Sequence, residues 1–307
     1  VGTKGTALFM SLDGNPTVAG NNVNGTVRVD PTRGIIRERA NASSSVYHSW
    51  QTSLEKRLSN NFSLAAHYTW STFIDDQSEI FNASSAGEVA VAQDSFNRKP
   101  ERARSTYDRP HRFTANFTWE VPFLREQKGA AGHILGGWTV ANFTTFQSGS
   151  PFSPLAGVDP GFRLSGIDSL IGSSIRPNTA GVATRGQSAE TLFGLRGAQV
   201  NVQIPATVTN YAPGLFSLPT ATSPLGNAGR NILRADGIGN LDLAIMKSFK
   251  MPYLENHALK IRGDFFNLTN SRNFGIPEAR INNAGFLNQW NTDGGNRRIV
   301  FTLRYAF

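Results

Sequence analysis

The chain has 307 residues, of which 39% are hydrophobic and 17% are charged, and it contains no cysteine. No run reaches the roughly 18 apolar residues that a membrane-spanning helix needs, which excludes a helical membrane protein, and the missing thiols exclude disulfides, thiolate zinc sites and cysteine nucleophiles. The net charge of +8 is compatible with nucleic acid, an anionic lipid surface or an anionic substrate. The 30 glycines and the many Asn, Ser and Thr residues favour a β-rich chain, because they weaken helices and populate turns.

Residues 1–45 are predicted to hold one strand end and a loop. The first ten residues do not place an apolar core behind a basic region, so they do not form a signal peptide. We expect either that a leader was removed or that the chain is a fragment of a longer protein.

Apolar and polar residues then alternate strictly, which is typical of strands because successive side chains point to opposite faces. Around residue 115, for example, Phe113, Phe117 and Trp119 share one face and oppose Arg112 and Glu120. Several runs last about ten residues, the length that a tilted strand needs to cross a bilayer. The predicted strands are 46–58, 61–75, 109–122, 137–149, 239–251, 257–270 and 297–307.

Four tryptophans lie near the ends of the apolar faces. Membrane-water interfaces attract such amphipathic rings, so we predict that they form interfacial girdles. These residues are Trp50, Trp70, Trp119 and Trp138.

Short and long connections alternate along the chain, as in a transmembrane barrel with short periplasmic turns and long extracellular loops. The long connections are 76–108, 151–238 and 272–296. The 151–238 connection is either a functional surface loop or partly disordered, with a small hairpin expected near 198–207. The predicted fold class is therefore all-β: an antiparallel transmembrane β-barrel built as a meander of long strands.

Five segments stand out in chain order: 47–58 (YHSWQTSLEKRL), 62–76 (FSLAAHYTWSTFIDD), 107–114 (YDRPHRFT), 136–152 (GGWTVANFTTFQSGSPF) and 264–270 (DFFNLTN). Together they resemble the barrel of TonB-dependent receptors of the Oar-like type. The resemblance covers nearly the whole chain from residue 47 and implies an outer-membrane transporter with a plug inside a barrel of about 22 strands. Seven or eight strands cannot complete such a barrel, and no segment resembles a plug. Residues 1–307 are therefore expected to be the C-terminal part of one.

The last segment alternates up to a terminal aromatic residue, which resembles the assembly signal that the barrel-insertion machinery reads. An unpaired strand edge can pair with such a partner through its backbone. The alternative is a last strand that happens to alternate. The predicted signal residues are Ile299, Phe301, Leu303, Tyr305 and Phe307.

Basic residues opposite the apolar faces are predicted to face the lumen, where they can draw anionic solutes or bond to a plug. The alternative is pairing with Glu55, Glu120 and Asp264, because buried charges are costly unless paired. The lumen-facing set is Arg57, Arg112, Lys260, Arg262, Arg298 and Arg304. A second set at the loop bases suits bidentate binding of lipopolysaccharide phosphates, and comprises Arg102, Arg104, Arg109, Arg272 and Arg297.

The chain shows no catalytic pattern. Its five histidines are scattered, and it has no phosphate-binding glycine loop or nucleophile elbow. Asp75 and Asp76 either help to bind a cation or line a solvated loop entrance. We expect no enzyme activity, no cofactor and no metal.

The leading hypothesis is a transporter or receptor in the outer membrane of a Gram-negative bacterium that moves or binds a large solute, with specificity in the three long loops. Its expected partners are outer-membrane lipid and lipopolysaccharide, the barrel-assembly machinery and, in a full-length receptor, a plug domain and the TonB complex. Nucleic acid is not expected.

Two alternatives remain open. A small autonomous porin or adhesin-like barrel requires the first strand to pair with the last. A soluble secreted β-protein that binds polysaccharide requires Trp70, Phe113 and Trp119 to pack against a second sheet.

Overall fold

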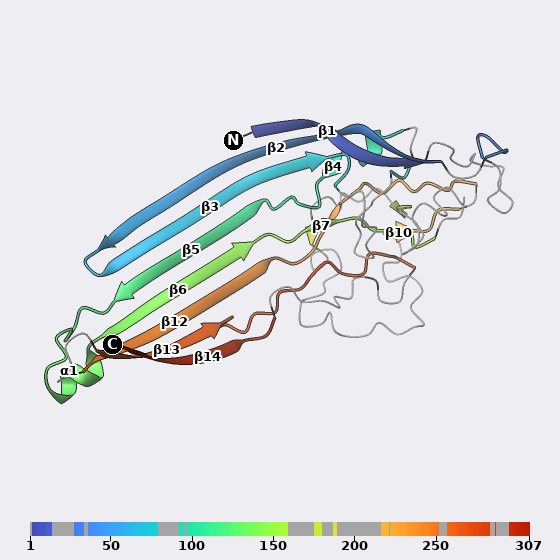
Figure 1. Cartoon of the computed structure of the whole chain (residues 1–307). Helices are drawn as coiled ribbons and strands as arrows, with labels where there is room; N and C mark the ends of the chain where they lie inside the picture. The colour runs from blue at the N-terminus through green and yellow to red at the C-terminus, as the bar shows by residue number, and fades with distance from the viewer. Residues whose placement is uncertain are drawn as a thin grey trace.

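Long antiparallel strands dominate the computed structural model of the chain (Figure 1). The structure describes residues 2–13, 28–33, 36–78, 92–94, 97–158, 175–179, 187–188, 216–220, 222–251, 257–282, 286 and 295–307. In this part of the chain the main sheet has the order β1-β2-β3-β5-β6-β12-β13-β14, with the short strand β4 beside β3. Each long strand therefore pairs with the next long strand in the sequence, as a meander requires.

The long strands span 9 to 23 residues. They are β1 (Gly2–Asp13), β2 (Arg37–Ser59), β3 (Phe62–Asp75), β5 (His111–Glu120), β6 (Trp138–Gln147), β12 (Ile238–Lys250), β13 (Ala258–Phe266) and β14 (Arg298–Ala306). The short elements of the connections are η1 (Lys99–Glu101), β4 (Ala103–Arg104), α1 (Gly129–Leu135), β7 (Pro151–Phe152), β8 (Asn178–Thr179), β9 (Gln187–Ser188), β10 (Phe216–Ser217) and β11 (Leu233–Arg234). None of the helices described is long and apolar enough to span a membrane.

The bounds of the seven predicted strands depart from the prediction by more than two residues at two places. Strand β2 begins at Arg37 rather than at residue 46, because residues 37–48 pair with β1. Strand β13 ends at Phe266 rather than at 270. There Asn267 and Asn270 adopt positive φ angles of 50° and 52°, which asparagine tolerates better than most residues and which ends the strand.

The turn between β2 and β3 consists of Asn60 and Asn61. Their φ angles are 50° and 65°, so both lie in the left-handed region that a two-residue hairpin turn of the primed type requires. This tight turn lies at the same end of the sheet as helix α1 (Figure 1). The long connections emerge at the opposite end, so the short and long connections are segregated.

The register gives the sheet one apolar and one polar face, because directly paired residues point to the same side. Trp50 pairs with Trp70, and Trp119 pairs with Phe62, all on the apolar face. Trp70 is 56% exposed and Trp119 is 38% exposed. The expectation of the soluble alternative, that a second sheet buries these rings, is therefore wrong for the described residues.

The tryptophans mark two levels on the apolar face. On β3, the partner of Trp119 is Phe62, eight residues before Trp70. Eight residues correspond to roughly 26 Å along a strand, and to about 20 Å of height at a tilt of about 40°. This height approaches the apolar band of about 25 Å in outer-membrane barrels.

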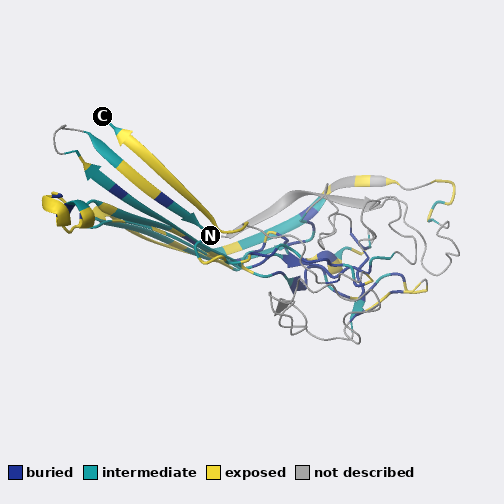
Figure 2. Cartoon of the chain, turned by 90° about the horizontal axis from the view of Figure 1, so that it is seen from below, coloured by how far each residue is buried: buried dark blue, intermediate teal, exposed yellow. Residues whose placement is uncertain are grey.

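Buried apolar residues are concentrated in the long connections rather than in the sheet (Figure 2). We call the described residues of the β3–β5, β6–β12 and β13–β14 connections the loop cap. Its core contains Phe152, Phe216, Leu233, Ile281 and Phe286, each at most 4% exposed. The hairpin expected near 198–207 lies outside the described residues.

Candidate solute-binding face and loop cap

The polar face of the sheet carries the six predicted basic residues. Lys260 pairs directly with Arg304, Arg262 with Thr302, and Phe266 with Arg298. Arg112 pairs with Thr69 and Gln147 on the same face. Arg57 lines a hollow of about 240 Å³ together with Ser63 and Thr118 of the polar face.

The alternative for these six residues was pairing with Glu55, Glu120 and Asp264. Among the described residues, such a pair forms at Asp264. Arg262 donates from Nε to the Oδ1 and Oδ2 atoms of Asp264 at 2.8 and 2.9 Å. Glu120 accepts instead from Arg125 in the short connection. Within the described part of the chain, no carboxylate forms an ion pair with the other five, which are Arg57, Arg112, Lys260, Arg298 and Arg304.

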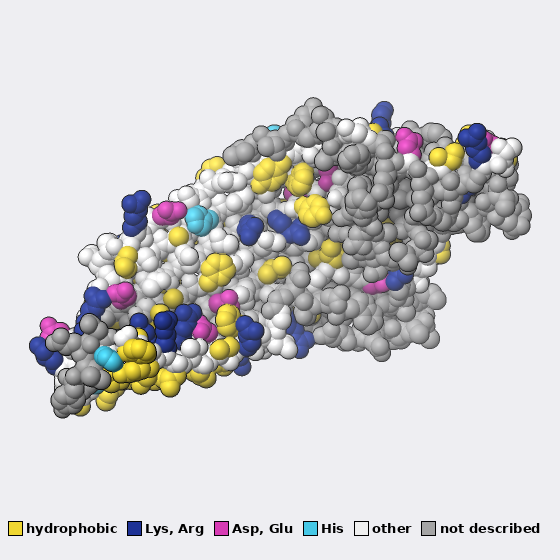
Figure 3. Space-filling view, viewed as in Figure 1, with side chains coloured by type: hydrophobic (Ala, Val, Ile, Leu, Met, Phe, Trp, Pro, Cys, Tyr) yellow, Lys and Arg dark blue, Asp and Glu magenta, His cyan; other side chains and the backbone are white. Residues whose placement is uncertain are grey.

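Two of these cations face each other directly. Lys260 and Arg304 are opposite residues on β13 and β14, and like charges in this arrangement repel. Dark blue side chains gather at the C-terminal side of the sheet in the view of Figure 3. An anionic group between the two side chains would remove the repulsion.

The polar face is hollowed across β6, β12 and β13. One hollow of about 260 Å³ is lined by residues that include Phe143, Asp242, Arg262 and Phe266. An adjoining hollow of about 380 Å³ shares Asp242 and Phe266 and adds Arg298. We call these five residues and the two hollows the polar-face groove.

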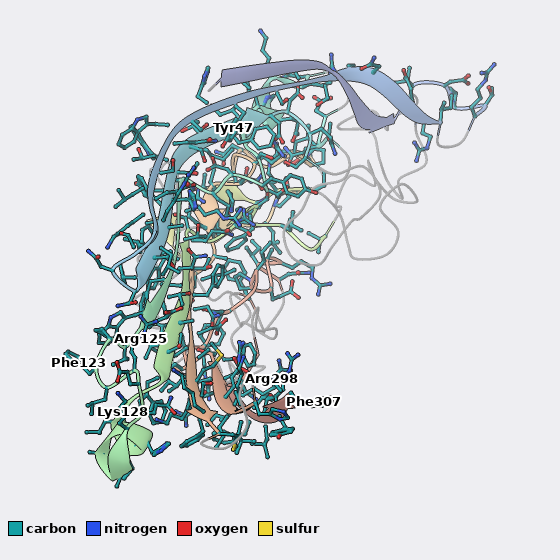
Figure 4. All side chains as sticks on the ribbon, turned by 60° about the vertical axis from the view of Figure 1, so that its left-hand side comes forward. Tyr47, Phe123, Arg125, Lys128, Arg298 and Phe307 are labelled. Carbon is teal, nitrogen blue, oxygen red and sulfur yellow. The ribbon has the colours of Figure 1, made fainter. Side chains whose placement is uncertain are left out.

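Side chains of the groove are held in place by the ends of three strands. Asp242 accepts from Asn240 Nδ2 at 2.9 Å and from the Asn267 amide at 2.8 Å. The Arg298 guanidinium lies 4.7 Å from the centroid of the Phe266 ring, a cation-π arrangement. Arg298, labelled in Figure 4, is the first residue of β14 and pairs with Phe266 at the end of the sheet nearest the loop cap. Guanidinium groups beside aromatic rings can bind a solute that combines anionic and ring-shaped parts.

Buried ion pairs join the long connections of the loop cap. Arg176 donates from Nη1 and Nη2 to the two carboxylate oxygens of Glu101 at 2.9 and 3.0 Å, and both side chains are nearly fully buried. The amide of Gln93 also donates to Glu101, and Arg176 Nε donates to the Ala228 carbonyl. The β3–β5 and β6–β12 connections are thereby held together by a buried network of hydrogen bonds and an ion pair.

The cap is tied to the sheet by further ion pairs. Arg230 pairs with Asp75 at the end of β3. Arg234 donates to Asp108 at 2.8 Å, while Asp108 also accepts from the Phe73 amide. Each contact fixes part of a long connection to the strand beside it.

The third long connection joins the cap through its backbone. The Leu155 amide donates to the Ala279 carbonyl, and the Ile281 amide donates to the Leu155 carbonyl, both at 2.8 Å. Beside them, hydrogen bonds to Glu278 raise the pKa of Arg280. All three loops predicted to carry specificity therefore meet in one cap.

The structure gives Asp75 and Asp76 different surroundings. Asp75 is buried against Arg230, and Asp76 Oδ1 accepts from the Ser43 hydroxyl and the Ser44 amide. Asp75 is thus removed from solvent, whereas Asp76 is half-buried and accepts its hydrogen bonds at the start of the long connection. The described residues also contain no group of three or more potential metal ligands.

The arginines proposed for lipopolysaccharide differ in their availability. Arg104 pairs with Asp108, and Arg109 donates to the Thr106 carbonyl at 2.7 Å, so both have structural roles. The others are exposed, and these are Arg102, Arg272 and Arg297.

The C-terminal residues alternate as the sequence predicted. Ile299, Phe301, Leu303 and Tyr305 pair with residues of the apolar face of β13. Phe301 is 74% exposed, and the terminal Phe307 is 91% exposed. Among the described strands, β14 pairs with β13 alone, so its other edge has free backbone groups.

Sequence reasoning missed two groups of residues. Arg176, Arg230 and Arg234 lie in a connection without periodicity, so nothing in the sequence linked them to their acidic partners. Lys247 lies on the apolar face opposite Trp138. It could have been found from the sequence, because it is a lysine at a position where the alternation requires an apolar residue. Helix α1 has only seven residues and was not predicted.

The chain is similar to solved structures at low sequence identity. A comparison with curated proteins finds no match. The solved structure of P. aeruginosa FpvA bound to heterologous pyoverdines is 9% identical, with a TM-score of 0.35, over 95% of this chain and 23% of that chain. The outer membrane transporter YddB from Escherichia coli is 11% identical, with a TM-score of 0.39, over 99% of this chain and 29% of that chain. The chain thus spans less than a third of either protein.

The family assignment rests on a match over most of the sequence. Residues 1–300 match the family described as the outer membrane beta barrel domain. The long antiparallel strands, the exposed apolar face and the segregated connections are what this family needs in a bilayer. The chain belongs to the outer membrane beta barrel domain family and lies in the bacterial outer membrane.

Proposed function

We propose that the chain forms part of the wall of an outer-membrane transporter of the TonB-dependent kind, and that the polar face of this wall contacts a large anionic solute. The observation that carries the proposal is the set of basic residues on the polar face without an ion-pair partner among the described carboxylates. Lumen charges tune selectivity in barrels, and uncompensated cations favour anions.

The loop cap supports the receptor part of this proposal. Its three connections share an apolar core and buried ion pairs, so they present a preorganised surface at the mouth of the barrel. Preorganised surfaces bind with a smaller loss of conformational entropy than mobile loops do. A solute selected by the cap would then meet the basic side chains of the wall.

The small autonomous porin is the weaker candidate. It requires β1 to pair with β14, but within the described sheet β1 pairs with β2 and β14 pairs with β13. The open arrangement favours a wall with further strands.

A transport experiment in cells tests the proposal. Accumulation of ferric chelates, acidic oligosaccharides and acidic peptides would be compared between cells with and without the protein, with the TonB system intact or deleted. We expect accumulation of at least one of these solutes only where both are present. Accumulation without the TonB system would indicate a passive porin, and surface binding without accumulation would indicate an adhesin.

The charge of the polar face is tested by a double variant. Lys260→Gln with Arg304→Gln should weaken uptake of the anionic solute, because it removes two facing cations that the solute would neutralise. Lys128→Gln is the matched control, since this side chain is 84% exposed in a short connection outside the groove. Equal effects of the two changes would remove the polar face from the proposal.

A further inference from the structure

The short connection between β5 and β6 exposes more apolar surface than a turn in water should. Phe123 is 66% exposed, Leu124 49%, Ile134 66% and Leu135 58%. Phe123 and Leu124 precede helix α1 in the sequence, and Ile134 and Leu135 are its last two residues. Exposed apolar side chains that gather in one place indicate an interaction surface.

This connection is a fixed element of the structure. The buried Gln127 donates from Nε2 to the Ser248 carbonyl at 2.6 Å and accepts from the Lys250 amide at 3.0 Å. A Cβ atom on Gly136 would lie 1.9 Å from the Leu124 carbonyl oxygen, so the backbone there is closely packed. The exposed apolar side chains are therefore held in place by the end of β12.

Two residues of the apolar face hold the C-terminal end of α1. Trp138 Nε1 donates to the Ile134 carbonyl at 3.0 Å, and Lys247 Nζ donates to the Ile134 carbonyl at 3.2 Å and to the Gly136 carbonyl. Trp138 and Lys247 are directly paired residues on β6 and β12. The helix end therefore lies over the face of the sheet that contacts lipid.

Lys247 shows why a cation is tolerated on this face. Its side chain is 3% exposed, and its Nζ atom lies 5.2 Å from the Trp138 ring centroid and 4.9 Å from the Phe249 ring centroid. Helix carbonyls and two aromatic rings thus replace water around the ammonium group. The lysine fixes α1 at the level of the tryptophan girdle.

We propose that the 122–136 connection is an interfacial anchor, and that Phe123, Leu124, Ile134 and Leu135 insert into the phospholipid leaflet at the periplasmic end of the barrel. The occupant is phospholipid because the apolar cluster continues the lipid-contacting face through Trp138 and Lys247. In Figure 4, Phe123 projects from the connection beside α1, with Arg125 and Lys128 close to it. The basic Lys128, 84% exposed, lies where headgroup phosphates are found.

Spin labels on single cysteines test the anchor directly, because the natural chain has no thiol to interfere. The full chain carrying Phe123→Cys or Ile134→Cys would be reconstituted in vesicles of phosphatidylethanolamine and phosphatidylglycerol. Accessibility to oxygen, which partitions into lipid, would be compared with accessibility to a water-soluble nickel chelate. The lipid reference is Phe301→Cys on the apolar face, and the water reference is Leu218→Cys in the loop cap, which is 44% exposed.

We expect the labels at 123 and 134 to show the oxygen preference of the label at 301. Labels that match position 218 would overturn the proposal, as would labels shielded from both reagents, because a protein partner would then cover the cluster. Lys247→Met provides a second readout. It should raise the mobility of the label at 134 and leave the label at 301 unchanged, since the hydrogen bonds from Lys247 to the Ile134 and Gly136 carbonyls are lost while β14 is untouched.

Discussion

The ion pair between Glu101 and Arg176 should hold the loop cap closed. Glu101→Ala leaves the Arg176 guanidinium buried without its carboxylate, although Nε still donates to the Ala228 carbonyl at 2.8 Å. Removing one partner of a buried pair costs roughly 3–5 kcal/mol. At about 1.4 kcal/mol for each factor of ten, opening of the cap should become at least about 100-fold more frequent.

Hydrogen exchange of individual cap amides measures this opening. The Ala156 amide donates to the Ile175 carbonyl at 2.7 Å and the Ala228 amide to the Pro177 carbonyl at 3.0 Å, so both report on the packing around Arg176. Their exchange should accelerate in Glu101→Ala, while amides in the middle of β12 keep their wild-type rates. Exchange proceeds through such local opening reactions.

Two further variants distinguish loss of the Glu101–Arg176 ion pair from a general loss of stability. Glu126→Ala breaks the exposed pair with Lys128 and should leave cap exchange unchanged, because solvent screens such pairs. Glu101→Leu with Arg176→Met should recover much of the protection, since two apolar residues leave no buried charge. An acceleration of less than about threefold in Glu101→Ala would refute the argument that this pair closes the cap.

Three other changes test separate parts of the fold. Asn60→Val should lower the stability of the barrel to urea by about 1–2 kcal/mol, because a β-branched residue resists the left-handed backbone at this turn, whereas Asn60→Gly should be tolerated. Leu243→Arg on the apolar face should cost roughly 2–4 kcal/mol in the same urea titration in lipid vesicles, and an equal loss from Ala244→Arg on the polar face would contradict the assignment of the two faces. Gly226→Ala should increase proteolysis of the cap, because the new Cβ would meet the Arg176 carbonyl oxygen at 2.0 Å; unchanged cleavage would show that the backbone there can move apart without cost.

The sheet could be predicted from the sequence because two solvents act on its two faces. Lipid on one side and a polar lumen on the other impose an alternation that Phe113 and Arg112 display directly, and pairing with neighbours then repeats it in register. The first residues of β2 were not predicted as a strand. They pair with β1 through backbone groups, and their sequence shows no alternation of apolar and polar residues.

The cap could not be predicted for a different reason. Glu101 and Arg176 are 75 residues apart, and Asp75 and Arg230 are 155 apart. Charge pairing over such separations leaves no periodic trace along the chain. The basic residues of the polar face were placed from alternation, but the pairing of Glu120 with Arg125 of the short connection depends on the geometry of the turn.

The pairing of β6 with β12 sets the order in which this wall can assemble. Every other neighbouring pair of long strands is joined by a shorter connection, whereas β6 and β12 are separated by about 90 residues. Closing a flexible loop of that length costs roughly 3 kcal/mol more than closing a two-residue turn. A cap that folds early brings the two strands together in advance, so damage to its ion pairs should slow insertion of the whole wall as well as loosening its mouth.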